Sequence, residues 1–258
     1  MPTVATVAKP TLVFIHGFLG SPDDWLEVVA ALDDRYACLL LTIPERNQQG
    51  QALRDWAALI AACEHQWTAL LPERFTLIGY SLGGRIAQAL SQIWLGRLEA
   101  LILQGAHPGL GSDLERSQRR RQDRQWSNCF RSEPLETALQ RWYRQSVFAR
   151  LSEQQRADLI QARTRALLDS ERMADLLLAA SLAGQPDYWA ALAQLPVPLL
   201  YINGAQDLKF CALAERLAKH RPSLERHQLP DTGHNCHHQT PKPYAALLAQ
   251  FLTQVPYD

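Results

Sequence analysis

The sequence predicts an α/β fold in which a mostly parallel sheet is flanked by helices and carries an inserted helical cap. Short, apolar, β-branched runs recur along the chain, and amphipathic segments with helical spacing separate them. One long stretch interrupts this alternation. With 258 residues and 47% hydrophobic content, the chain is long enough to bury one substantial core.

The alternation begins near the N-terminus. Residues 11–18 (TLVFIHGF) form a dense β-branched run, which suits a strand buried on both faces. Residues 24–34 then have helical spacing. Residues 36–44 indicate a second buried strand closed by its final proline, and residues 52–71 a long amphipathic helix.

The alternation continues around a group of glycines. Residues 74–80 predict a third strand, and residues 85–95 a helix that begins directly after the glycines. Residues 98–106 and 196–205 complete the set of strand candidates.

The stretch from about 110 to 190 is helical, rich in arginine and tryptophan, and without a clear strand. We therefore expect a core in two parts, residues 1–109 and 191–258, with residues 110–190 inserted as the cap.

Composition restricts the function and the location. The 26 basic residues balance 26 acidic ones, so no bulk charge points to nucleic acid or an anionic membrane surface. The five cysteines are scattered and form no C-x-x-C pair, which argues against a disulfide framework or a zinc site. The first ten residues, MPTVATVAKP, lack a basic start followed by a long apolar run, and no apolar stretch approaches the roughly 18 residues that a membrane helix needs. We expect a cytoplasmic protein with no membrane insertion, no nucleic-acid partner and no obligate protein partner.

A catalytic serine is predicted in the stretch LIGYSLGGR, residues 77–85. G-x-S-x-G between a predicted strand and a predicted helix is typical of a nucleophile elbow, where the serine occupies a strained turn and its neighbours must be small. The alternative is a helix start capped by Ser81, with the glycines there for tight packing.

Two further segments favour the catalytic interpretation. Asp207 follows a predicted strand in LLYINGAQD, and His234 lies in the loop LPDTGHN before the last helix. The chain order Ser, Asp, His is the one used by α/β-hydrolases. In such a triad His234 takes the proton of Ser81, while Asp207 fixes the histidine tautomer and stabilises its charged form.

An oxyanion hole is expected from backbone groups. The loop His16-Gly17-Phe18 normally gives one N–H in this fold, and Leu82, directly after the serine, gives the other. We expect His16 itself to be a packed loop residue rather than a catalytic one.

Arginines point to an acidic substrate. Arg85 opens the helix beside the serine, and the cap contains RSQRRRQDRQW (116–126) and QARTR (161–165). Guanidinium groups converging above Ser81 would suit carboxylates. A single cap arginine more often belongs to a solvated helix face, and Trp142 more often to the cap core.

Several blocks of sequence resemble one family, and those inside the cap are the most specific because caps vary greatly between α/β-hydrolases. They are GYSLGGR, GAHPGL, R-x-x-R…DRQW, EPL…WY-x-Q-x-VFA-x-L…QR, SLA-x-QPD, D-x-KF-x-ALA and GHN-x-H. Together they resemble the MenH-type 2-succinyl-6-hydroxy-2,4-cyclohexadiene-1-carboxylate synthases of menaquinone and phylloquinone biosynthesis. One departure is IPERNQQG (43–50), where that family often has a Pro-Gly-His-Gly loop.

The resemblance implies a lyase. A proton is removed at the succinyl group of 2-succinyl-5-enolpyruvyl-6-hydroxy-3-cyclohexene-1-carboxylate, electrons pass through the ring, and pyruvate leaves without consumption of water. It implies that Ser81, activated by His234 and Asp207, acts as the base, and that the N–H groups of Phe18 and Leu82 hold the developing enolate oxygen.

The resemblance also implies a set of substrate-binding residues. Nothing in the sequence requires a metal or an organic cofactor. The arginines for the substrate carboxylates would be Arg85, Arg119 and Arg163, and the other pocket residues Tyr80, Trp142 and His107.

Two other hypotheses stay open. A carboxylesterase, thioesterase or C–C hydrolase for a small acidic substrate would use the same triad, with Ser81 as the acylating nucleophile. A binding protein on a hydrolase scaffold would hold a ligand without chemistry.

Overall fold

A computed structural model describes residues 9–32, 34–166 and 169–257. Six strands form one sheet in the order β2-β1-β3-β4-β5-β6, and every pairing in it is parallel. The predicted α/β fold is confirmed. The strands are β1 (Thr11–Ile15), β2 (Ala37–Leu41), β3 (Phe75–Tyr80), β4 (Leu98–Gln104), β5 (Leu199–Gly204) and β6 (Glu225–Leu229).

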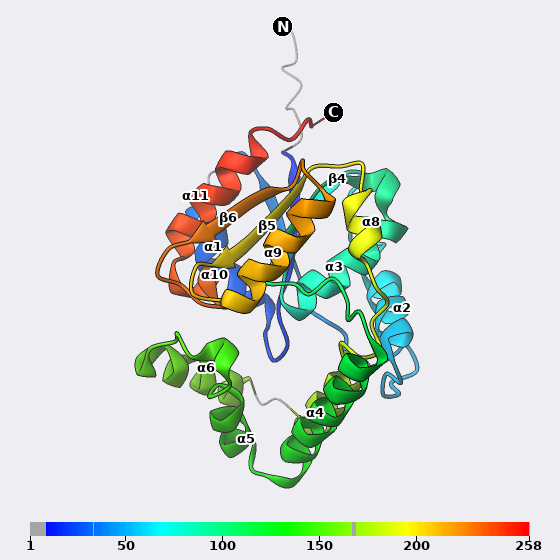
Figure 1. Cartoon of the computed structure of the whole chain (residues 1–258), viewed down its shortest axis with the longest axis vertical. Coiled ribbons are helices and arrows are strands. Elements are labelled where there is room, and N and C mark those ends of the chain that lie inside the picture. The colour runs from blue at the N-terminus through cyan, green and yellow to red at the C-terminus, as the bar shows by residue number, and fades with distance from the viewer. Residues whose placement is uncertain (1–8, 33, 167–168, 258) are drawn as a thin grey trace, which may run out of the picture.

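Helices cover both faces of the sheet (Figure 1). Alternate residues of each central strand point to opposite faces, so Leu12 and Phe14 of β1 pack in one hydrophobic cluster while Val13 and Ile15 pack in the other. The first cluster lies under α1 (Leu26–Ala31) and α11 (Pro241–Leu252). The second lies under α2 (Trp56–Trp67), α3 (Leu82–Ile93), α8 (Trp189–Ala193) and α9 (Leu208–His220).

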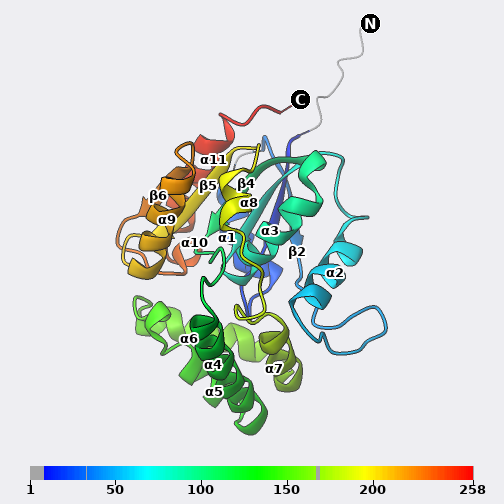
Figure 2. The same ribbon diagram turned by 45° about the vertical axis from the view of Figure 1, so that its right-hand side comes forward.

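The described residues between β4 and β5 form helices and loops. We call α4 (Asp113–Ser132), α5 (Leu135–Trp142), α6 (Glu153–Arg165) and α7 (Ser170–Ala179) the helical insertion. In both views it lies beyond one end of the sheet, while the C-terminal end of α11 lies at the opposite end (Figures 1 and 2). Short elements complete the chain: η1 (Pro22–Trp25), η2 (Leu95–Arg97), η3 (Ser146–Phe148) and α10 (Cys236–Gln239).

The carboxyl ends of the central strands lie at one edge of the sheet. Ile15 of β1 is in register with Gly79 of β3, and Tyr80 of β3 with Gln104 of β4. Because all strands are parallel, the loops that follow them meet at this edge, where open α/β sheets bind ligands. The segments carrying Phe18, Ser81 and Asp207 all follow these strand ends.

Several elements differ from the predictions. The strand predicted as buried within residues 36–44 is β2, an edge strand in which only Leu41 is buried. β6 was not predicted, because its sequence ERHQL is polar and only Leu229 is buried. The helix expected from residue 85 begins at Leu82, so Gly83 and Gly84 lie inside its first turn.

Candidate active site

Ser81 occupies the sharp turn between β3 and α3. Its φ of 51° and ψ of −108° lie outside the regions that L-residues commonly adopt, and its amide donates to the carbonyl of Gln104 at 2.8 Å. The turn places the serine at the carboxyl edge of the sheet.

The neighbouring glycines allow α3 to approach the sheet closely. A Cβ on Gly83 would lie 2.3 Å from the carbonyl oxygens of Ile15 and His16. One on Gly79 would lie 2.5 Å from the carbonyl oxygen of Gly83, and one on Gly84 2.6 Å from the Cβ of Ala106. The glycines are therefore required by the backbone-to-backbone distance, and the serine is raised as a result.

Ser81, His234 and Asp207 form a hydrogen-bonded chain. Nδ1 of His234 lies 2.7 Å from Oδ2 of Asp207, and Nε2 lies 3.1 Å from Oγ of Ser81. A carboxylate only accepts, so Nδ1 carries a proton and Nε2 is the nitrogen that accepts from the serine hydroxyl. His234 and Asp207 are buried. This arrangement lets the histidine remove the serine proton.

The imidazole of His234 is fixed by its surroundings. The ring of Phe210 lies against it, with centroids 4.7 Å apart. On the other side a Cβ on Gly105 would lie 2.8 Å from Cε1 of the imidazole, and Gly105 has a φ of 54°. Glycine is needed at this position for both reasons.

Gln104 supports the triad, and sequence reasoning missed it. Its carbonyl accepts from the amide of Ser81, while its Nε2 donates to the carbonyl of His234 at 3.1 Å and to Nδ1 of His237 at 2.9 Å. The available signal was a single glutamine at the end of an otherwise apolar buried strand, LEALILQ.

The backbone N–H groups of Phe18 and Leu82 are the predicted oxyanion donors. Within the described residues, neither N–H has a hydrogen-bond acceptor. An unpaired N–H beside a buried triad is costly unless a ligand oxygen or water accepts from it. The ring of Phe18 packs against Trp142 of the helical insertion, with centroids 5.1 Å apart.

His16 has a structural role. Its Nδ1 lies 2.8 Å from the carbonyl oxygen of Gly17, and the amide of Ile43 donates to Nε2 at 3.1 Å. Burial lowers the pKa of His16 to about 4. With both ring nitrogens in use, His16 fits the expected packed loop residue.

A cavity of about 240 Å³ opens above Ser81 and His234, between the core and the helical insertion. The insertion side includes Arg119, Trp126 and Trp142, and the core side Lys209 and Phe210. The remaining lining residues are Gln122, Asp123, Gln145, Ser146, Val147 and Phe148.

Arg119 is the one of the three predicted arginines that lines this cavity. Its Nε donates to both carboxylate oxygens of Asp123, at 2.8 and 2.9 Å. Its two terminal nitrogens have no hydrogen-bond partner in the part of the chain that the structure describes.

Arg85 points toward the segment after α7 and is not among the cavity-lining residues. Its Nε donates to Oε1 of Gln185 at 2.5 Å, and Nη2 to the carbonyl of Ala180 at 2.7 Å. Its guanidinium also lies over the ring of Trp56. Burial and then the charge of Arg119 lower the pKa of Arg85 to about 9.

Arg163 also lies outside the cavity lining and pairs with an internal carboxylate. Its two terminal nitrogens donate to the two oxygens of Asp24, both at 2.7 Å, and its Nε donates to the hydroxyl of Tyr143 at 3.4 Å. Both members of the ion pair are buried. Arg163 can reach a substrate carboxylate only if Asp24 releases it.

Of the other predicted pocket residues, Tyr80 and His107 are not among the cavity-lining residues. Trp142 lines the cavity. The ring of Tyr80 lies 5.2 Å from that of His234 by centroids. Nδ1 of His107 accepts from the amide of Gly109 at 3.1 Å, and burial and then the positive charge of Lys209 lower the pKa of His107 to about 3.

Lys209 is a cavity residue that sequence reasoning left out. It lies two positions after Asp207, in the first turn of α9. Partial burial and then the charge of Arg119 lower its pKa. It belongs to the D-x-KF-x-ALA block, so the signal was a lysine two positions after a triad residue.

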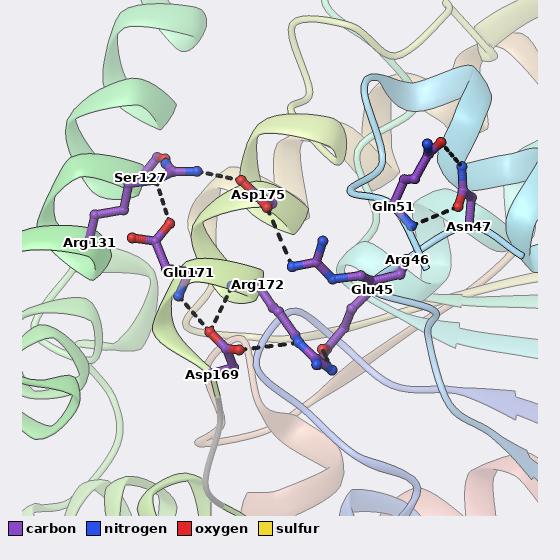
Figure 3. A network of polar contacts seen from close by, with 10 residues as sticks. All are labelled: Glu45, Arg46, Asn47, Gln51, Ser127, Arg131, Asp169, Glu171, Arg172 and Asp175. Carbon is purple, nitrogen blue, oxygen red and sulfur yellow. Dashed lines mark hydrogen bonds and ion pairs between the residues drawn. The ribbon is translucent and has the colours of Figure 1, made fainter. Parts of the chain in front are cut away.

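A larger groove, of about 560 Å³, lies away from the triad between residues 42–48 and α2, with Arg172 of α7 at its edge. Beside it an ionic network connects the loop after β2 with the insertion (Figure 3). Arg172 lies 3.8 Å from Glu45, and Arg46 lies 4.0 Å from Asp175. None of the triad residues is in the lining of the groove.

Nothing in the described part of the chain has the length and apolarity of a membrane-crossing helix.

Comparison with known proteins shows the family of the chain. A model of the alpha/beta hydrolase family matches residues 12–247. The chain is 38% identical over 247 residues to a 2-succinyl-6-hydroxy-2,4-cyclohexadiene-1-carboxylate synthase of Enterobacter sp. (strain 638), covering 94% of this chain and 92% of the relative. Another synthase of that name, from Escherichia coli (strain SMS-3-5 / SECEC), is 38% identical, with 94% of each chain covered.

Solved structures share the fold. MenH from S. aureus superposes with a TM-score of 0.86 at 22% identity, covering 97% of this chain and 96% of that one. A thermophilic esterase from Thermogutta terrifontis gives 0.74 at 21% identity, covering 96% and 90%. With the synthases matched along almost their whole length, the chain belongs to the alpha/beta hydrolase family and, within it, to the 2-succinyl-6-hydroxy-2,4-cyclohexadiene-1-carboxylate synthases.

Proposed function

We propose that this enzyme is a carbon–oxygen lyase of menaquinone or phylloquinone biosynthesis. It eliminates pyruvate from 2-succinyl-5-enolpyruvyl-6-hydroxy-3-cyclohexene-1-carboxylate and forms 2-succinyl-6-hydroxy-2,4-cyclohexadiene-1-carboxylate. The observation that carries the proposal is the 38% identity to synthases of this product along 94% of the chain. We assign it to the cytoplasm, in agreement with its five unpaired cysteines.

The triad supplies the base. Nε2 of His234 accepts the proton of Ser81 Oγ over the 3.1 Å hydrogen bond, and the serine oxygen removes the proton from the ring carbon that bears the succinyl ketone. Asp207, 2.7 Å from Nδ1, keeps the imidazole in the correct tautomer and stabilises its charged form. Ser81 acts here without forming a covalent bond to the substrate.

The backbone supports the charge that develops. Loss of the proton moves negative charge to the ketone oxygen, and the unpaired N–H groups of Phe18 and Leu82 are the donors we assign to it. The electrons then pass through the ring double bond and break the carbon–oxygen bond to the enolpyruvyl group. The departing group takes up a proton and becomes pyruvate, so the reaction consumes no water.

Positive side chains bind the acidic substrate. The substrate carries carboxylates on its succinyl, enolpyruvyl and ring positions. Arg119 and Lys209 line the cavity beside Ser81. Arg119 pairs with Asp123 through Nε, and its terminal nitrogens have no partner among the described residues. We also assign Arg85 and Arg163 to carboxylate binding, and Tyr80, Trp142 and His107 to the pocket wall.

The decisive experiment is pyruvate release from freshly prepared substrate, measured with a coupled dehydrogenase. The intact protein should release pyruvate far faster than spontaneous decay, and Ser81→Ala should fall close to that background, because the base is removed. Release by the intact protein at the background rate would contradict the proposal.

A serine hydrolase is the second candidate, because the same Ser81–His234 hydrogen bond and the same two N–H groups would serve acyl transfer. An acylating enzyme should show a burst of phenolate from an activated ester and accumulate an acylated Ser81 detectable by mass spectrometry. Pyruvate release without any acylated serine would favour the lyase.

A further inference from the structure

Arginines from both the core and the helical insertion donate hydrogen bonds to one short segment. This segment, residues 180–185 (ASLAGQ), follows α7 directly. Arg85 of α3 donates to Ala180 and Gln185, and Arg116 of α4 donates to the carbonyls of Ala183 and Gln185 at 3.3 and 2.8 Å. The triad mechanism gives this segment no role, although its sequence is one of the blocks singled out above.

The segment reaches Arg119 through a buried carboxylate. Asp123 is 2% exposed and lies one helical turn after Arg119 on α4. The hydroxyl of Ser181 donates to Oδ2 of Asp123 at 2.6 Å, and the same hydroxyl accepts from the amide of Ala183 at 3.2 Å. The hydroxyl is thereby oriented, and it fixes the carboxylate that binds Nε of Arg119.

The hydrogen bonds between Asp123 and Arg119 do not use the terminal nitrogens of the guanidinium group. Asp123 engages only Nε, while the two terminal nitrogens have no partner among the described residues. A planar guanidinium fixed through Nε presents its terminal nitrogens in one direction, as bidentate binding of a carboxylate requires. Arg119 also lies close enough to Arg85 for their charges to repel each other, so its side chain needs a fixed anchor.

We propose that Asp123 and Ser181 are positioning residues: Ser181 orients the carboxylate of Asp123, and Asp123 holds Arg119 so that its terminal nitrogens face the cavity above Ser81. The proposal rests on the proposed function for the assignment of Arg119 to a substrate carboxylate. Neither Asp123 nor Ser181 takes part in the chemistry.

Ser181→Ala is the most direct test, because it removes the hydroxyl without changing any charge. We expect KM for the acidic substrate to rise about tenfold while kcat stays within about twofold, which is the size expected for one hydrogen bond to a charged group. Ser91→Ala is the matched control, since it removes another buried hydroxyl, one that donates to Gln88 within α3. The control should leave KM unchanged.

Asp123→Asn tests whether loss of the carboxylate charge raises or lowers KM for the acidic substrate. If Asp123 positions Arg119, the variant raises KM. If Asp123 instead competes with the substrate for Arg119, removing its charge lowers KM, and that result would overturn the proposal. A KM within twofold of the intact protein in a folded Ser181→Ala variant would overturn it as well.

Binding of succinate, measured by calorimetry, separates this proposal from the proposed function. If the intact protein releases pyruvate, the KM values of Ser181→Ala and Asp123→Asn decide whether the positioning role holds. If it does not, the lyase assignment fails and succinate affinity decides: weaker binding by Ser181→Ala than by Ser91→Ala supports the positioning role, and equal binding overturns it.

Discussion

At the scale of single residues, Asp207 determines which nitrogen of His234 carries a proton. Its Oδ2 accepts from Nδ1 at 2.7 Å, which leaves Nε2 free to accept from Ser81. We expect Asp207→Asn to lower kcat at least about a hundredfold with little change in KM, because the amide can donate to Nδ1 and stabilise the wrong tautomer. Steady-state pyruvate release measures both constants.

Asp231→Asn is the control for that change. Asp231 is exposed, lies three residues before His234, and has a φ of 55°, which asparagine tolerates. This variant should keep the activity of the intact protein. An Asp207→Asn enzyme with full kcat would show that the tautomer is not set by Asp207.

Sequence reasoning located Ser81 and Asp207 because each follows a predicted strand, and His234 because it lies in a loop before the last helix. The three occur in a chain order that is specific to one fold. It could not give the partners of the arginines. Arg163 lies 139 residues from Asp24, and nothing in either local sequence indicates that they pair. Chain position shows that a guanidinium is near a site, but only the packed structure shows whether a carboxylate already occupies it.

At the scale of elements, the contact of α3 with β1 depends on Gly83. A Cβ at this position would lie 2.3 Å from two backbone oxygens, which cannot move aside as a flexible side chain could. We expect Gly83→Ala to lower the free energy of unfolding by about 3 kcal/mol or more, by overpacking. Urea denaturation of the intact protein and the variant measures the change.

Gly96→Ala is the matched substitution. A Cβ on Gly96 has no atom within 4 Å and its φ is not in the left-handed region, so stability should change by less than about 1 kcal/mol. If the two variants are equally stable, close approach is not the reason for glycine at position 83.

The same elements show where sequence patterns were sufficient. Five strands were found because each of them is a continuous apolar run. β2 and β6 are both edge strands, but β2 has the apolar sequence ACLLL, whereas β6 was missed because its sequence ERHQL is polar. The start of α3 was placed too late because glycines normally interrupt helices, whereas here tertiary contact requires them.

Two kinds of ion pair connect the helical insertion with the core. Arg163 and Asp24 are buried and bidentate, whereas Arg46 and Asp175 are partly exposed and 4.0 Å apart (Figure 3). We expect Arg163→Met to lower the free energy of unfolding by about 3 kcal/mol or more, because it leaves Asp24 buried without its main partner. Arg46→Met should cost less than about 1 kcal/mol.

Urea denaturation at pH 7 compares the two variants directly. Equal losses of stability in the two variants would mean that burial of the Arg163–Asp24 pair does not determine how much the pair stabilises the protein. A loss of lyase activity in Arg163→Met at a temperature where the variant stays folded would add support to its assignment as a substrate-binding residue.

At the scale of the whole molecule, the site is assembled from segments that are far apart in sequence. The core contributes Ser81 and His234, and the insertion contributes Arg119 and Trp142. Burial in this assembly also keeps several histidines neutral. Burial lowers the pKa of His16 to about 4 and of His107 to about 3, and it lowers that of His237 well below the usual value.

These histidines should make the protein sensitive to acid. Below pH about 6.5 the unfolded chain binds protons that the native state does not, so the free energy of unfolding falls as pH drops from about 6.5 toward 4. For His16 alone the slope is about 1.4 kcal/mol per pH unit in the middle of this window. Urea denaturation at pH 7, 6 and 5 gives the slope.

His16→Gln should reduce that slope by about one proton, whatever it does to stability at pH 7, because the unfolded state no longer gains a proton at this position. His65→Gln, at an exposed position of α2, is the control substitution. If His16→Gln and the intact protein have the same slope between pH 7 and 5, His16 takes up a proton in the native state. Its hydrogen bond from the amide of Ile43 would then have to break without unfolding the loop after β1.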